Sequence, residues 1–211
     1  MKLPKESDAH AAGLDVRTGN KKFVKSIRIN SKKLRKLERS KNPFLSLASS
    51  IISQQISLSA AGSIRKRFIT LFGKKKPNPL DTLKFSDEEL RAVGLSRSKI
   101  VYIRDLAEKF LNKTINPKHF DKMSDEDIKE HLIQVKGIGP WTGDMFLIFA
   151  LNRPDVLPVG DLGVLKGFQK VFNLKKLPSI KKMQALAKPY VGKRTQLSLY
   201  LWGSLETEID L

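Results

Sequence analysis

The spacing of hydrophobic residues predicts a chain built from helices. Apolar positions recur every three or four residues through most of the sequence, and no stretch shows the sustained apolar–polar alternation of a half-buried strand. With Asn42 as an N-cap and Pro43 at the first helical position, the clearest run contains Phe44, Leu47, Ala48, Ile51 and Ile52. The pattern therefore predicts an all-α fold.

Capping residues mark several further helix starts. Ser86 with Glu89, and Ser124 with Asp127, have the spacing of a capping box, and Ser96 precedes a longer apolar run as an N-cap. Later helices are expected to begin near Asp161, Ser179 and Lys193. The first 40 residues show no clear period, because Gly13, Gly19 and Asn20 interrupt it.

The charge of the chain restricts its partners. It has 211 residues, with 40 basic and 21 acidic side chains and a net charge of +19 spread along the sequence. Such a charge favours a polyanion, most often nucleic acid, because phosphate neutralisation releases condensed counterions. An acidic membrane surface is the rival, but no apolar run approaches the ~20 residues of a span, and no signal peptide or lipidation motif is evident. We expect a soluble, intracellular protein without a membrane partner.

The absence of cysteine excludes disulfides, thiolate zinc sites, iron–sulfur clusters and cysteine nucleophiles. The three histidines, His10, His119 and His131, are not spaced to share a metal ion. Any catalysis must therefore depend mainly on carboxylates, amides, hydroxyls and the backbone.

Residues 135–143, VKGIGPWTG, form a short glycine-containing turn between two predicted helices. One helix ends near Gln134 and the next begins at Pro140, which is a helix–hairpin–helix arrangement. Glycines allow positive φ and close backbone approach, while the amides of such a turn and the following helix N-terminus attract phosphate. A tight corner that binds nothing is the simpler alternative, but the net charge favours the DNA backbone. The predicted phosphate-binding residues are Lys136, Gly137, Ile138, Gly139 and Thr142.

Aromatic and acidic residues follow this turn. Trp141, Met145 and Phe149 lie along one stripe of the second helix, which would ordinarily face a core. Asp161 stands twenty residues after Trp141, at the predicted start of another helix. An aspartate there is most often only an N-cap, although an N-cap can also have a catalytic role.

Four motifs, in this order, resemble the helix–hairpin–helix glycosylase superfamily. They are SIISQQIS, LIQVKGIGPWTG, LPVGDLG and KPYVGKRTQLSLYLW, and they extend from about residue 40 to 203. Within the superfamily the chain is most similar to the alkylbase DNA glycosylases, the AlkA and yeast-type 3-methyladenine enzymes.

The resemblance implies base excision repair of alkylated DNA. Such an enzyme flips a damaged nucleotide out of the duplex and hydrolyses its N-glycosidic bond, releasing 3-methyladenine or 7-methylguanine. By motif match Asp161 is the catalytic carboxylate. The base pocket would contain Trp141, Met145 and Trp202, and the wedge that fills the vacated stack would be Gln54, Gln55 and Ile56. Core packing for Trp202 and a polar interhelical loop for the wedge are the alternatives. Trp141 replaces the lysine of strand-cleaving relatives, which predicts a monofunctional enzyme.

The same resemblance implies the remaining properties. No cofactor is expected, except for a structural Na⁺ or K⁺ bound by the backbone carbonyls of Ile133, Val135 and Gly137. The partner would be double-stranded DNA with alkylated bases or abasic sites, bound by a monomer, in the nucleus of a eukaryote or the cytoplasm of a bacterium. Two helical lobes are expected, residues 43–153 and residues 1–42 with 154–211, with the DNA and the base in a cleft between them.

Several positions depart from the family pattern. Gly160 replaces a second acidic residue, Met145 a tyrosine, Gly143 an alanine and Gly192 a proline, while Gly163 lies inside the helix that Asp161 begins. These changes keep a second hypothesis open, a non-catalytic protein that binds and bends abasic or damaged DNA. A generic hairpin module that binds any duplex is a third, but it leaves the spacing from Trp141 to Asp161 unexplained.

Overall fold

The described part of the chain, residues 39–206, is helical in the computed structural model, and it contains no strand. This confirms the all-α prediction. Within these residues no helix combines the length and apolar character needed to cross a membrane. Residues 1–38 and 207–211 lie outside the described part, so the prediction of no clear helical period at the N-terminus falls mostly on residues that are not described.

The chain divides into two compact units. The first is Ser40–Phe146, and the second contains Leu147–Leu211, of which residues up to 206 are described. The division falls within helix α9 (Pro140–Phe149), which contributes residues to both units.

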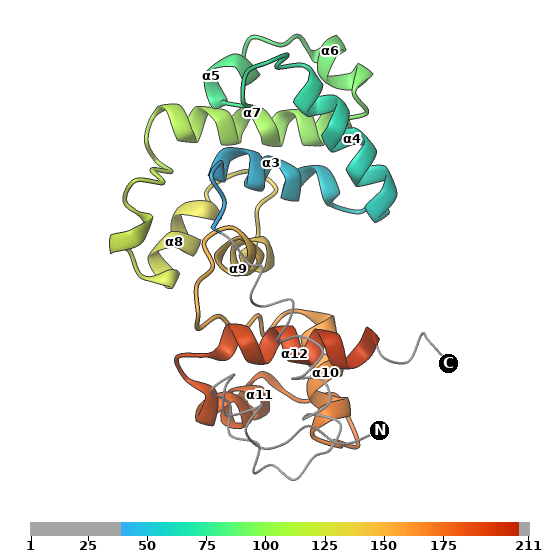
Figure 1. Cartoon of the computed structure of the whole chain (residues 1–211), viewed down its shortest axis with the longest axis vertical. Coiled ribbons are helices and arrows are strands. Elements are labelled where there is room, and N and C mark those ends of the chain that lie inside the picture. Colours follow the sequence, from blue (N-terminus) through green and yellow to red (C-terminus); the bar gives the residue numbers. More distant parts are fainter. Residues whose placement is uncertain (1–38, 207–211) are drawn as a thin grey trace. The chain divides into compact units, whose positions relative to one another are not determined.

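The first unit is organised around two helices that pack against each other, α3 (Pro43–Ser53) and α7 (Arg97–Leu111) (Figure 1). Around them lie α4 (Leu58–Thr70), α5 (Pro79–Thr82), α6 (Asp87–Ala92), the short 3-10 helix η1 (Phe120–Lys122) and α8 (Asp125–Leu132). The apolar stripes of α3 and α7 are fully buried, including Leu47, Ile51, Ile103 and Leu106. The predicted helical period therefore corresponds to real core faces.

The capping predictions are confirmed. Asn42 accepts a hydrogen bond from Leu45 N–H with Pro43 at the first position of α3, and both capping boxes are formed in full. One predicted end shifts, because α8 ends at Leu132 rather than near Gln134, whereas α12 begins at Arg194, near Lys193 as predicted. Caps are local interactions, so the sequence predicts starts better than ends.

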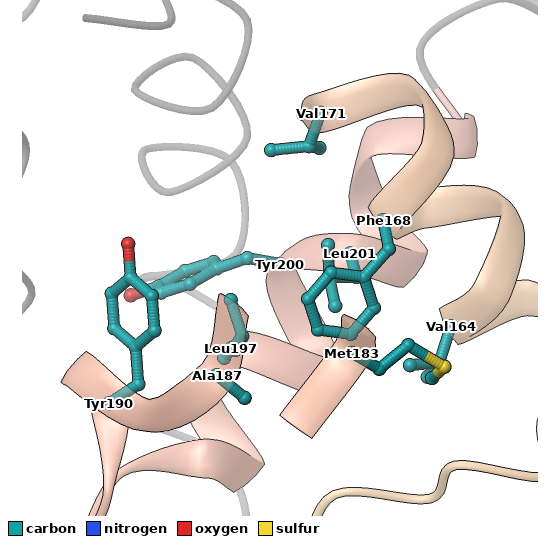
Figure 2. Packing of buried hydrophobic residues seen from close by; sticks show 9 residues of the cluster. All are labelled: Val164, Phe168, Val171, Met183, Ala187, Tyr190, Leu197, Tyr200 and Leu201. Atoms are coloured by element: carbon teal, nitrogen blue, oxygen red, sulfur yellow. The ribbon is translucent and has the colours of Figure 1, made fainter. Parts of the chain in front are cut away.

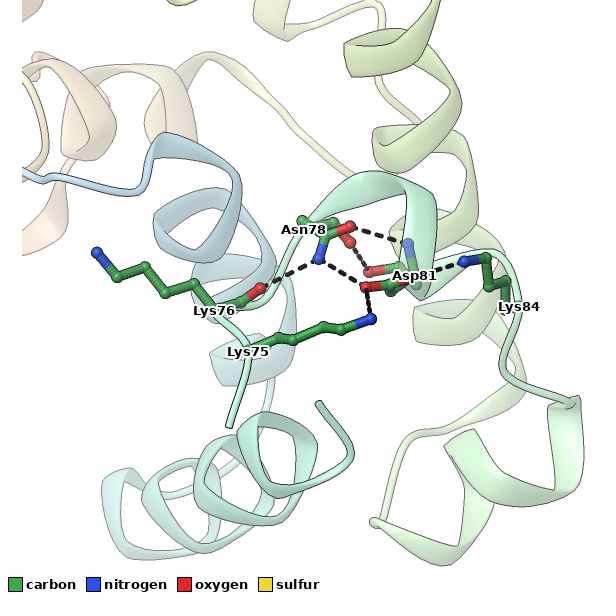
Figure 3. A network of polar contacts seen from close by, with 6 residues as sticks. Lys75, Lys76, Asn78, Asp81 and Lys84 are labelled. Atoms are coloured by element: carbon green, nitrogen blue, oxygen red, sulfur yellow. Dashed lines mark hydrogen bonds and ion pairs between the residues drawn. The ribbon is translucent and has the colours of Figure 1, made fainter. Parts of the chain in front are cut away.

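A surface network lies where the sequence has the basic run FGKKKPNP. Asn78 is the N-cap of α5, and its side-chain amide also donates to Asp81 at 3.0 Å (Figure 3). Lys84 Nζ lies 2.8 Å and Lys75 Nζ 3.5 Å from the same carboxylate. The hydrogen bond from Lys84, with that from Asn78, lowers the pKa of Asp81 to about 2. Lys75 and Asn78 of this basic run therefore take part in local hydrogen bonds and ion pairs around the start of α5.

The second unit has its own core, formed mainly by α10 (Leu162–Val171), α11 (Ile180–Ala187) and α12 (Arg194–Glu206), with the short η2 (Lys188–Tyr190) (Figure 2). α10 and α12 approach closely at Gly167, where an added Cβ would lie 2.6 Å from the carbonyl oxygen of Leu201. The buried residues are Val164, Phe168, Val171, Met183, Ala187, Tyr190, Leu197, Tyr200 and Leu201.

An ion pair fixes the start of α12. Asp155 accepts from Arg194 Nε and Nη2 at 2.7 Å each, and from the Arg194 backbone N–H at 3.1 Å. These hydrogen bonds hold the pKa of Asp155 below its ordinary value. The bidentate geometry anchors α12, which carries Trp202, to the segment that precedes α10.

Candidate functional site

The turn between α8 and α9 has the predicted hairpin geometry. Gly137 has φ +79°, a conformation that other residues rarely adopt, and an added Cβ there would overlap the ring of Tyr102. Gly139 carbonyl accepts from Gly143 N–H at 3.1 Å, so α9 starts directly behind the turn. The two glycines therefore have different roles. Gly137 provides a positive φ and room for the Tyr102 ring, whereas Gly139 lies where the chain enters α9.

The amides of the turn are not equally available. Lys136 N–H donates to Asp105 Oδ2 at 2.8 Å, and Ile138 N–H donates to Val135 carbonyl at 3.0 Å. Among the described residues, neither Gly137 N–H nor Gly139 N–H has a hydrogen-bond acceptor. Of the predicted phosphate ligands, the backbone of these two glycines and the exposed side chain of Lys136 are best placed.

Two other predicted phosphate ligands have buried side chains. Ile138 is 5% exposed and Thr142 is 4% exposed. Thr142 lies in the first turn of α9, where backbone N–H groups have no partner within the helix. Because the residue as a whole is buried, Thr142 offers little surface to a phosphate.

The predicted cation ligands are backbone carbonyls at this turn. Val135 carbonyl accepts from Ile138 N–H, and Gly137 carbonyl accepts from the side-chain amide of Gln54 at 2.7 Å. Each carbonyl oxygen has a second lone pair, so this oxygen set is compatible with an alkali cation. No group of three or more histidine, cysteine or acidic side chains that could hold a metal occurs in residues 39–206. The cation site stays a prediction.

A cleft of about 490 Å³ in the first unit brings several predicted residues together. One wall is the stripe of α9, where Trp141 is 49% exposed and therefore does not serve as core packing. The opposite residues come from the end of α3 and the loop after it. The lining residues are Ser49, Ser50, Ser53, Gln54, Gln55, Trp141 and Met145.

The predicted wedge segment has two roles. Gln55 has φ +57°, which costs a residue other than glycine about 1–2 kcal/mol, and it is exposed, as Ile56 is at 37%. Gln54 differs, because its side chain points to the hairpin turn and donates to Gly137. A strained, exposed backbone position is typical of functional sites.

In the second unit, Asp161 caps α10 as predicted. Its Oδ1 accepts from Val164 N–H at 2.7 Å and from the indole N–H of Trp202, also at 2.7 Å. The N-terminus of α10 adds a favourable positive potential for an ionised carboxylate. Trp202 is also stacked on Phe149, with ring centroids 5.9 Å apart. Trp202 thus acts on the carboxylate directly, a contact that the sequence did not reveal.

Of the glycines at which the sequence departs from the family pattern, Gly163 has a clear structural reason. At Gly163 an added Cβ would lie 2.7 Å from Trp202 Cδ1 and 3.0 Å from Asp161 Oδ1, so the glycine makes room for the indole. At Gly143 an added Cβ would lie 3.1 Å from Cγ of the flexible Lys129 side chain, so the structure does not require glycine there. The Nζ of this lysine is 3.3 Å from Asp144 Oδ1. Burial raises the pKa of Asp144, an effect that Lys129 opposes.

Sequence reasoning missed the residues that support the loop and the turn. Lys99 Nζ donates to the carbonyls of Ile52 and Gln54, at 2.7 and 2.9 Å, and burial lowers the pKa of this lysine. Asp105 holds the turn through Lys136 N–H. Both contacts join residues far apart in sequence, and no local pattern signals them.

The hairpin turn between α8 and α9, with the cleft beside it, defines a helix–hairpin–helix protein. Comparison with protein families agrees, because the model for HhH-GPD superfamily base excision DNA repair proteins matches residues 48–192. The chain belongs to this superfamily.

Named relatives are 3-methyladenine glycosylases. DNA-3-methyladenine glycosylase 1 of Schizosaccharomyces pombe is 34% identical over 202 residues, which cover 93% of this chain and 86% of the relative. The DNA-3-methyladenine glycosylase of Saccharomyces cerevisiae is 37% identical over 176 residues, 79% of this chain but only 58% of the relative. The chain thus spans little more than half the length of some relatives.

Solved structures give the same result. The S. pombe 3-methyladenine DNA glycosylase Mag1 in complex with abasic DNA has a TM-score of 0.73 and 30% identity, covering 94% of this chain and 95% of that one. A DNA-3-methyladenine glycosidase from Bacillus halodurans has a TM-score of 0.75 and 33% identity, covering 89% and 91%.

Proposed function

We propose that the protein is a monofunctional DNA glycosylase that releases alkylated purines, such as 3-methyladenine and 7-methylguanine, from double-stranded DNA. The observation that carries the proposal is the cleft that exposed Trp141 shares with the wedge loop, the segment Gln54–Ile56 after α3. In addition, α10 begins at an aspartate, Asp161, that accepts two hydrogen bonds. Membership of the superfamily and similarity to enzymes named as 3-methyladenine glycosylases support it.

Binding begins at the phosphate backbone. Gly137 N–H, Gly139 N–H and the exposed Lys136 side chain would hold one phosphate, assisted by the N-terminus of α9. The net charge of +19 supplies the long-range attraction. Gln55 and Ile56 would then fill the space that the everted nucleotide leaves, which offsets a few kcal/mol of unstacking.

The base would be recognised by its charge. Alkylation at N3 or N7 makes a purine cationic, and a cation over an indole gains about 0.5–2 kcal/mol. The exposed face of Trp141, with the polarisable Met145 beside it, suits such a base. Normal purines lack the charge and would bind the cleft more weakly.

Hydrolysis would need a carboxylate but no acid. As the N-glycosidic bond breaks, its electron pair leaves with the cationic base, which departs as a neutral purine. Asp161 would stabilise the positive charge on the sugar and position the water that attacks C1′, accepting its proton. The two donors on Oδ1, Val164 N–H and the Trp202 indole N–H, would hold the carboxylate in one orientation for this role. Trp141 stands where strand-cleaving members of the resembled family carry a lysine nucleophile, which supports a monofunctional enzyme.

The test is Asp161→Asn, which keeps an oxygen for Val164 and Trp202 and removes only the charge. Methylated duplex is incubated with full-length protein, and released bases are separated and counted. Wild type should release 3-methyladenine, and the variant at least ~100-fold more slowly, while affinity for an abasic-site duplex changes by less than ~3-fold. If wild type releases no base yet binds abasic duplex tightly, the protein is a non-catalytic binder. Equal affinity for damaged and undamaged duplex at one salt concentration would indicate a generic hairpin module.

A further inference from the structure

One face of α7 contacts both segments of the first unit that are proposed to bind DNA, the loop after α3 and the hairpin turn. Lys99, Tyr102 and Asp105 are spaced by three residues and therefore lie along one side of the helix. Neither Lys99 nor Asp105 is close in sequence to the groups that it binds, so the contacts are purely tertiary.

Lys99 supports the wedge loop. Its ammonium group donates to the carbonyls of Ile52 and Gln54, which belong to the end of α3 and lack partners within that helix. The next residue, Gln55, is the one with φ +57°. Lys99 therefore fixes the backbone where the chain turns to expose Gln55.

The other two residues support the hairpin turn. The ring of Tyr102 fills the space that a Cβ of Gly137 would occupy, and Asp105 accepts from Lys136 N–H at 2.8 Å. Asp105 is also 3.8 Å from Lys109 Nζ on the same helix. Tyr102 and Asp105 of α7 thus contact the turn at two successive residues, Gly137 and Lys136.

Gln54 joins the two segments directly. Its side-chain amide donates to Gly137 carbonyl at 2.7 Å, across 83 positions of sequence. The wedge loop, the hairpin turn and α7 thereby form a closed set of contacts, from Lys99 to the loop, through Gln54 to the turn, and from the turn back to Asp105.

We propose that this set of contacts, the α7 brace, fixes the offset between Gln55 and the phosphate-binding turn, and that Lys99 is a positioning residue for recognition of a gap in the base stack. A duplex held by a phosphate on the turn presents its base steps at a set distance. Gln55 enters the right step only if the loop is rigid relative to the turn. Attraction to undamaged duplex depends on charge and does not need this rigidity. The proposal rests on the proposed function, because it assumes that Gln55 fills the gap.

The experiment compares two duplexes for each full-length variant, one containing a tetrahydrofuran abasic site and one undamaged, at one salt concentration. Lys99→Met keeps the aliphatic chain and removes the donor, Lys99→Arg keeps a donor, and Gln54→Ala removes the link to the turn. Lys118→Met makes the same change of charge at an exposed loop position. A 2-aminopurine beside the abasic site reports unstacking by its fluorescence.

We expect the ratio of affinities, abasic over undamaged, to fall about tenfold in Lys99→Met and Gln54→Ala, with a weaker fluorescence change. In Lys99→Arg and Lys118→Met the ratio should stay within about twofold of wild type. If Lys99→Met does not fold, Gln54→Ala and Lys99→Arg decide. A wild-type ratio in both Lys99→Met and Gln54→Ala, or equal loss for both duplexes, overturns the brace. If wild type itself shows no preference for the abasic duplex, the proposed function has failed instead.

Discussion

Replacing Gly163 by alanine should slow catalysis although alanine is the better helix former. The new Cβ would lie 2.7 Å from Trp202 Cδ1 and 2.9 Å from its Nε1, and 3.0 Å from Asp161 Oδ1. Ordinary carbon contacts are about 3.5–4.0 Å, so the indole must move by close to 1 Å. Such a shift breaks the 2.7 Å hydrogen bond from Trp202 to the carboxylate.

Two effects of Gly163→Ala on the free energy of unfolding oppose each other. Alanine in a helix interior gains about 1 kcal/mol over glycine, while overpacking costs about 1–3 kcal/mol. The net free energy of unfolding should therefore fall by up to about 2 kcal/mol. The lost hydrogen bond to a charged group is worth about 1.5–3 kcal/mol. If it stabilises the carboxylate mainly in the transition state, base release slows by about 10- to 100-fold.

The assay is single-turnover release of 3-methyladenine from methylated duplex, together with thermal unfolding. Gly62→Ala is the matched control, because Gly62 also lies inside a helix but an added Cβ meets nothing within 4 Å. That variant should be more stable and fully active. Trp202→Phe removes the same donor, so its effect should not add to that of Gly163→Ala. A Gly163→Ala protein with wild-type rate and raised stability would refute this account of the glycine.

Two further predictions concern pH and stability. Arg194 lowers the pKa of Asp155, so this ion pair stabilises the fold above the ordinary carboxyl pKa and loses its effect as the pH falls through the pKa of the folded state. Asp155→Asn should therefore lower the free energy of unfolding by about 1–2 kcal/mol at pH 7. Denaturant titrations should show that this difference from wild type vanishes in strong acid. Burial raises the pKa of Asp144, and Lys129 opposes this effect. Lys129→Met should therefore destabilise the protein by about 1–3 kcal/mol at pH 7, and by less in strong acid, where Asp144 is protonated. An unfolding free energy that is lower by the same amount at both pH values would contradict the second prediction.

Much of the fold is determined by local sequence. The N-caps at Asn42, Ser86, Ser124 and Asp161 follow from interactions within four residues, and a side chain that satisfies a nearby N–H does so wherever the helix lies. The sequence also predicted the glycine-containing turn before Pro140, because few residues other than glycine adopt its backbone conformation. These signals were sufficient to predict the helices, the hairpin and the position of the aspartate.

The tertiary structure decided which side chains support that chemistry. Gly163 looked like a weak point in a helix, and only the approach of Trp202, from nearly forty residues later, explains it. Lys99 and Asp105 resemble any other charged residues of an amphipathic helix until α3 and the hairpin turn meet them. The reason is physical: periodicity and capping report energies that a segment has by itself, whereas a close approach or a hydrogen bond between distant residues exists only after the segments have packed.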